Sequence, residues 1–288
     1  MKTNQLLRSL FLATLLALTA QLPASAALKI QPVFIGGTPP PTNILVGGGD
    51  LQQIFKIAAE RWERVFKNGG GKWQVTIEYG WTNLLDSSQY AKEFYVAEGG
   101  NPVHMTRSRV FFNNNPTFNP TNGPVGLFLD PTPRDNSKYL RYTVDRENLE
   151  EGQVNVGRVF SEPTGDATNR IDLLSTATHE IGHSLGLDTD FSGLTNQFFE
   201  GNFIYIKAPL PLAGYLVALR MGGGDHLETF HTALMVGEAN GGERKFISNI
   251  DILLIAQINY FERPNLGEPL DALLTRPSSR NSGQDNQR

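Results

Sequence analysis

The chain has 288 residues, a formal net charge of −4 at neutral pH and no cysteine. The negative charge gives no indication of nucleic-acid binding. The absence of thiols excludes disulfides, a cysteine nucleophile and thiolate metal ligands, so any metal site must use His, Asp or Glu side chains.

The first 26 residues have the features of a secretory signal peptide. Lys2 and Arg8 form a basic start, residues 10–20 are apolar, and Ala24-Ser25-Ala26 is a small-residue cleavage pattern. The apolar run is shorter than the roughly 20 residues that a membrane-spanning helix needs, and no later segment is long and apolar enough to cross a membrane. We therefore predict a signal peptide at 1–26 and a secreted or extracytoplasmic protein, with the periplasm included.

The segment after the signal peptide predicts a strand, a helix and two more strands. Residues 28–35 form the first strand, and Asp50 is placed to cap a helix whose apolar residues recur at helical spacing over 51–66. Residues 73–79 alternate as a strand, and residues 108–112 form another.

The middle of the chain is less regular. Residues 115–138 are rich in Pro, Asn and Gly and are expected to form a loop. Weaker strand predictions follow at 140–144 and 154–160.

A second helix is predicted to begin at Asn169, which is spaced from Asp172 like the two members of a capping box. Apolar residues recur at helical spacing as far as Leu185, and Gly186 is the expected stop. This helix contains the histidine motif described below.

The remaining elements are a strand pair and a third helix. Residues 203–206 and 215–219 are predicted strands, and Ser248 is placed to cap a final helix with an apolar stripe. Strands mixed with three separated helices predict an α+β domain over 27–275. The polar residues 276–288 are expected to be a disordered tail.

The segment His179-Glu180-Ile181-Gly182-His183 has the spacing of a zinc site. On a helix, His179 and His183 lie one turn apart on one face, where both imidazoles can bind the same ion. Glu180 then lies beside the metal, where it can take a proton from the activated water and return it to the leaving amine. Such strings also arise by chance, but this one lies in a predicted helix, and four of the five histidines fall between 179 and 231.

Residues 179–186 resemble the zinc-binding pattern of metzincin peptidases through its glycine. Thr232-Ala-Leu-Met235 resembles the metzincin Met-turn, whose methionine lies beneath the metal. Residues 172–178 and 247–251 are similar to matrixins, so the resemblance covers about 165–260.

This resemblance implies a metzincin-like zincin with a mixed twisted sheet, two long helices, a Met-turn and a C-terminal helix. It implies a secreted zinc-dependent endopeptidase whose catalytic domain spans 27–275, with one catalytic Zn²⁺ and protein or peptide substrates bound along an edge strand. A structural Ca²⁺ is common in the family, but no oxygen-rich loop pattern places one. We expect a monomer with no nucleic-acid partner and no membrane span after signal cleavage.

The third metal ligand departs from the family pattern. A histidine is usual ten residues after the first, and Thr189 occupies that position. The alternatives are Asp188 or Asp190, one residue out of register, and two later histidines, His226 and His231.

We favour His226 as the third ligand. In leishmanolysin-like enzymes the third histidine also follows an insertion, here about 190–225, and precedes the Met-turn. Gly222-Gly-Gly gives His226 a flexible approach, whereas His231 lies only four residues before Met235.

The displaced ligand keeps two other functions open: a secreted zinc-binding or adhesive module without turnover, and a zinc hydrolase of another fold with a downstream Glu as third ligand. Gly237 stands where some metzincins use a tyrosine, which leaves the oxyanion donor unassigned. The specificity pocket is expected at 236–247, and His104 is interpreted as structural or surface.

Overall fold

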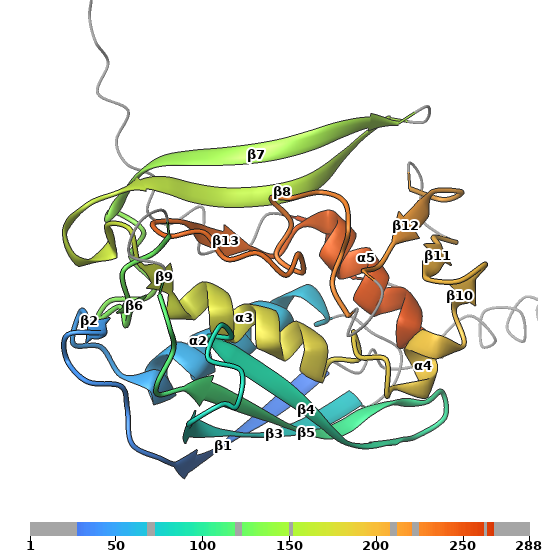
Figure 1. Cartoon of the computed structure of the whole chain (residues 1–288). Helices are drawn as coiled ribbons and strands as arrows, with labels where there is room; N and C mark the ends of the chain where they lie inside the picture. The colour runs from blue at the N-terminus through green and yellow to red at the C-terminus, as the bar shows by residue number, and fades with distance from the viewer. Residues whose placement is uncertain are drawn as a thin grey trace, which may run out of the picture.

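The computed structural model describes residues 28–67, 73–118, 123–149, 152–207, 212–220, 225–261 and 264–267. Helices and strands are mixed along the chain, which confirms the α+β class. A four-stranded sheet lies on one side of the molecule and a long β-hairpin on the other, with helices between them (Figure 1). The predicted signal peptide and the predicted tail lie outside the described residues.

The largest sheet has the strand order β1-β3-β5-β4. Strands β1 (Leu28–Gly36), β3 (Trp73–Thr82) and β5 (His104–Asn113) are parallel, whereas β4 (Ala91–Gly99) is antiparallel to β5 and forms an edge. The sheet is therefore mixed, as expected. Strand β4 is absent from the sequence predictions because it lacks apolar alternation and buries a charged residue, Glu93.

Two helices stack beside this sheet: α2 (Leu51–Val65) and α3 (Leu173–Ser184). The predicted cap of α2 is confirmed, because the Asp50 carboxylate accepts hydrogen bonds from two N–H groups of the first turn at 3.1 and 3.3 Å. The fully buried Trp62 donates from Nε1 to the Thr178 carbonyl at 2.8 Å, which ties α2 to the middle of α3.

Helix α3 begins later than predicted. Its cap is Asp172, whose carboxylate accepts from the Ser175 N–H at 3.0 Å. The prediction that Asn169 caps the helix is wrong: Asn169 has a φ of 54°, and its side chain donates to the Gly123 carbonyl at 3.3 Å. The predicted end is confirmed, because Gly186 follows the helix with a φ of 111°, a conformation that favours glycine.

The hairpin consists of β7 (Tyr139–Leu149) and β8 (Gly152–Pro163), which extend both weaker strand predictions. Strand β13 (Arg244–Phe246) pairs antiparallel with β8. Three two-residue strands form a separate parallel ladder: β2 (Leu45–Val46), β6 (Leu127–Phe128) and β9 (Ile171–Asp172). Strand β6 lies inside the predicted loop 115–138, and a 3₁₀ turn (Gly165–Ala167) precedes α3.

The predicted insertion contains α4 (Ser192–Thr195), a fourth helix that the sequence does not predict. It also contains a small antiparallel sheet of β10 (Phe198–Phe199), β11 (Phe203–Tyr205) and β12 (Leu216–Ala218). The last two strands confirm the predicted pair.

Helix α5 (Asn249–Ile258) begins at the predicted Ser248, which forms a capping box with Asp251. Its burial extends around nearly the whole helix, beyond the predicted stripe, because it lies under β8 and against the main core. None of the described helices is long and apolar enough to cross a membrane.

Candidate metal centre

Three histidines converge on one point. The Nε2 atoms of His179 and His183 are 3.0 Å apart, and Nε2 of His179 is 3.1 Å from Nε2 of His226. Among the described residues, this is the one group of three or more His, Cys, Asp or Glu side chains whose ligand atoms lie within 4.8 Å of one another. The structure thus brings together the three residues that the sequence predicts as metal ligands.

Backbone carbonyls orient two of the rings. Nδ1 of His179 lies 2.8 Å from the Leu234 carbonyl, and Nδ1 of His183 lies 2.7 Å from the Leu187 carbonyl. Each Nδ1 must carry the proton and donate it, because a carbonyl oxygen only accepts. The Nε2 lone pairs of both rings are therefore left for the common point, as in protein metal sites.

All three imidazoles are held neutral. Burial, followed by the charges of the neighbouring histidines, lowers the pKa of His179 well below its ordinary value. Burial also lowers the pKa of His183 to about 4 and that of His226 to about 3. Neutral imidazole is the form that binds a metal ion.

Two of the three separations between these nitrogens fit zinc. Zn–N bonds of about 2.0–2.1 Å in tetrahedral geometry place neighbouring ligand atoms roughly 3.3 Å apart. The separations of 3.0 and 3.1 Å in the structure are close to that value. The donor set, three neutral imidazoles of which two have their protons turned outward, is also one that zinc prefers.

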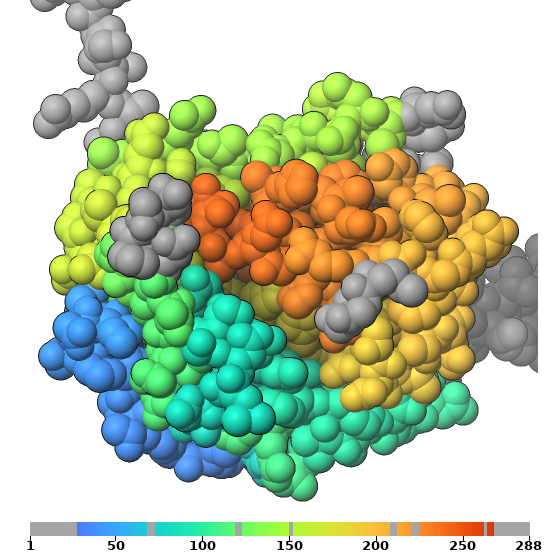
Figure 2. Space-filling view, viewed as in Figure 1, coloured from blue at the N-terminus to red at the C-terminus, as the bar shows by residue number. Residues whose placement is uncertain are grey.

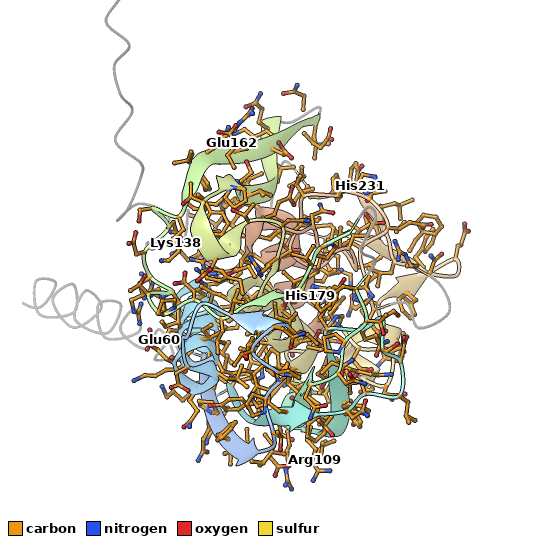
Figure 3. The ribbon with its side chains drawn as sticks, turned by 60° about the vertical axis from the view of Figure 1, so that its left-hand side comes forward. Glu60, Arg109, Lys138, Glu162, His179 and His231 are labelled. Atoms are coloured by element: carbon orange, nitrogen blue, oxygen red, sulfur yellow. The ribbon has the colours of Figure 1, made fainter. Side chains whose placement is uncertain are left out.

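The alternative third ligands do not join this group. His231 is exposed and lies at the periphery, far from the central His179 (Figure 3). Asp190 is exposed as well. Asp188 is buried and lines the same cavity, but its carboxylate accepts from the Asp190 N–H at 2.7 Å.

Met235 lies directly beneath the histidine helix. Its side chain is fully buried, and a Cβ added at Gly182 would overlap its Sδ atom. This contact explains why glycine stands in mid-helix, where it ordinarily costs about 1 kcal/mol relative to alanine.

The turn before Met235 is held by the last helix. The fully buried Asp251 accepts from the N–H groups of Leu234 and Met235 at 3.1 and 3.0 Å, and from Ser248 at 2.7 Å. The same turn supplies the Leu234 carbonyl that orients His179. The cap of α5 therefore fixes both the turn and one ring of the site.

Glu180 lies beside the histidines and is only 6 % exposed. Burial raises its pKa to about 8. A hydrogen bond from the Glu93 backbone N–H and the charge of Lys92 partly oppose this rise. Its carboxyl group borders the same cavity as the three imidazoles.

A cavity of about 650 Å³ lies in front of these residues. Figure 2 shows it as a hollow with α3 at its floor, between the segment leading into β4 and the segment 234–245. The first residues of the edge strand β4 form one wall.

The sequence does not single out two carboxyls around the site, the buried Glu93 and the half-buried Asp225. Burial raises the pKa of Glu93 to about 10, helped by a hydrogen bond to Asp188 and by the charges of Asp188, Glu180 and Asp225. Burial and the charge of Asp188 raise the pKa of Asp225 to about 6. The position of Asp225 next to His226 was the only sequence signal for either residue.

Side chains of the predicted pocket segment, residues 236–247, point in two directions. Glu238, Glu243 and Lys245 line the cavity, whereas Arg244 is completely buried behind it. The Arg244 guanidinium forms ion pairs with Asp130 at 2.6 Å and with Asp172, the cap of α3, at 2.8 Å.

Gly237 packs against the ring of His226, to which an added Cβ would come as close as 3.0 Å. This close approach gives a reason for glycine at the position where some metzincins carry a tyrosine. The oxyanion donor stays unassigned.

His104 has the structural role that the sequence suggests. Its Nδ1 lies 3.0 Å from the Pro102 carbonyl, and its ring contacts Trp73. No second group of His, Asp or Glu side chains converges in the described ranges, so a calcium ion stays unplaced.

No protein-family model matches this chain, and neither does any curated protein or any solved structure. The interpretation of the site therefore depends on the chemistry of its own residues. That chemistry consists of three converging neutral imidazoles, one carboxyl group beside them and an open cavity in front.

Proposed function

We propose that this protein is a secreted zinc-dependent endopeptidase of the metzincin type. The observation that carries the proposal is the convergence of Nε2 atoms from His179, His183 and His226 at separations suited to zinc. Glu180 beside them, Met235 beneath them and an edge strand along the cavity add support.

When bound, a zinc ion would supply positive charge that polarises the peptide carbonyl, favours deprotonation of a water and favours the ionised form of Glu180. Glu180 accepts the proton of the attacking water on a carboxylate oxygen. It then donates that proton to the nitrogen of the leaving amine as the C–N bond breaks. The Glu93 backbone N–H favours the ionised form of this carboxyl group.

An extended peptide suits this cavity. Strand β4 has β5 on one side only, so its other edge can pair with a substrate strand. Main-chain hydrogen bonds along β4 would then hold the peptide across the histidines while its side chains enter the cavity.

Zinc content and proteolysis together test the proposal. We expect one zinc per chain by mass spectrometry and cleavage of unfolded casein that a chelator abolishes and added zinc restores. Bound zinc without cleavage of any unfolded protein would instead favour the zinc-binding or adhesive module. Export is tested by sequencing the N-terminus of the secreted protein, which should begin at Ala27.

A further inference from the structure

A buried cation lies in one wall of the cavity. Side chains of β13 alternate in direction, so Arg244 points into its ion pairs while Lys245 points to the opposite side and lines the cavity. Only 5 % of Lys245 is exposed, which is rare for a lysine without an acidic partner.

Within the part of the chain that the structure describes, the ammonium group of Lys245 donates only two of its three possible hydrogen bonds. Its Nζ donates to the carbonyls of His231 and Glu238, both at 3.0 Å. An ammonium has three donors, so one N–H is left. No carboxylate of the described residues forms an ion pair with Lys245, although the charges of Glu243 and Asp251 counteract the lowering of its pKa by burial.

Lys245 is close to the proposed reaction centre. Its charge contributes to the lowered pKa of His179, and its backbone N–H donates to Ser175 Oγ in the first turn of α3 at 2.9 Å. Ser175 and Thr176 in the same wall are already hydrogen-bonded to Asp172. Lys245 thus offers a substrate group a donor that Ser175 and Thr176 do not.

Glu238 and Glu243 line the cavity together with Lys245, whereas two other acidic side chains lie farther along α3. Asp188 and Asp225 lie beyond the C-terminal end of α3, where Asp225 accepts from the Thr189 N–H. Helix α3 has 12 residues and is therefore about 18 Å long. The backbone of Lys245 lies beside the first turn of α3, whereas Asp188 and Asp225 lie beyond its last turn.

We propose that the part of the cavity around Lys245 is a subsite for a carboxylate of the substrate. The inference rests on the proposed peptidase function and names its specificity. A carboxylate would accept the remaining N–H of Lys245 in a charge-assisted hydrogen bond, whereas a neutral amide would leave the buried charge uncompensated. The carboxylate has two possible sources, an Asp or Glu side chain inside a peptide or the C-terminal end of the peptide.

Matched peptides distinguish these sources. An internally quenched peptide that the zinc-loaded protein cleaves is made with Glu or Gln at each position around the scissile bond, and each with a free or an amidated C-terminus. We expect one position at which Glu raises kcat/KM at least about tenfold over Gln. A preference for the free C-terminus alone would identify the chain end as the source.

Variants of Lys245 assign the preference to this residue. Lys245→Met should bring the Glu-to-Gln ratio of kcat/KM close to one, and Lys245→Arg should retain the preference. Binding of the same peptides to the Glu180→Gln protein, followed by fluorescence anisotropy, should show the same order without any turnover.

Two results would overturn the subsite. One is that the unmodified protein cleaves and binds the carboxylate and amide peptides equally well. The other is a preference for the carboxylate that survives in folded, zinc-bound Lys245→Met. If no peptide is cleaved, the peptidase proposal fails, and the binding measurement still decides the subsite. If Lys245→Met does not fold, the ratio in the unmodified protein and in Lys245→Arg decides it.

Discussion

The backbone N–H of Thr189 donates a hydrogen bond to Oδ1 of Asp225 at 3.0 Å. Thr189 occupies the position of the usual third metzincin ligand, and Asp225 immediately precedes His226. The residue at that position is therefore hydrogen-bonded to the neighbour of the histidine that we propose as the third ligand. This relationship gives a physical reason why a histidine so distant in sequence reaches the two of α3.

The first prediction concerns the third ligand. His226→Ala should lower bound zinc well below one per chain, because two imidazoles on a helix hold zinc weakly without a third. His231→Ala is the matched control and should keep full zinc, since His231 is exposed and donates no ring atom to the site. Mass spectrometry after dialysis measures both, and the opposite pattern would make His231 the ligand.

Asp225 should matter through its hydrogen bond to Thr189. Asp225→Ala removes the acceptor and should weaken zinc binding by about tenfold, the range found when groups that orient ligands are lost. Asp225→Asn retains an acceptor oxygen, so its zinc affinity should be closer to that of the unmodified protein. Competition with a chromophoric chelator gives the affinities, and equal loss in both variants would point to the charge rather than the hydrogen bond.

Gly182 and Met235 should show strong energetic coupling. Gly182→Ala would normally stabilise a helix, but the added methyl overlaps Met235, so we expect a loss of about 1–3 kcal/mol. In Met235→Ala the space is open, and the same change at Gly182 should cost much less. Urea unfolding of both single variants and the double variant measures the coupling, and additive effects would contradict the packing.

Glu93 should make the protein less stable as pH rises. Its folded pKa, about 10, lies above the ordinary value of 4.5, so between these values the folded state holds a proton that the unfolded chain has released. Raising the pH then favours unfolding, by up to about 1.4 kcal/mol per pH unit for one proton. The groups that face Glu93 are Asp188, Glu180 and Asp225.

Glu93→Gln tests this dependence because the amide can still donate to Asp188 but has no proton to lose. We expect the free energy of unfolding of the metal-free variant to change less with pH between about pH 7 and pH 9, where histidine titration is complete. Urea unfolding at several pH values measures it. An unchanged slope would show that Glu93 is already ionised in the folded protein.

The sequence predicts most helices and strands of this fold because their local signals agree with their burial. Asp50 and Ser248 cap their helices as expected, and Gly186 ends α3. The cap of α3 is misplaced because Asn169 has the right residue type, while its backbone is in a turn that local spacing does not reveal.

The site is predicted only where its residues are close in sequence or follow a known pattern. Strand β4 escapes prediction because its burial is set by α3 and by other carboxyls, so a buried Glu93 looks like a surface residue in the sequence. The direction of Lys245 depends on pairing between β13 and β8, which is long-range as well.

Glu180 carries both proton transfers of the proposed mechanism. Glu180→Gln keeps the shape of the side chain but cannot accept the proton of the attacking water. We expect this variant to bind one zinc per chain and to leave casein uncleaved, with activity lowered at least about 100-fold. Full casein cleavage by zinc-loaded Glu180→Gln would contradict the proposed mechanism.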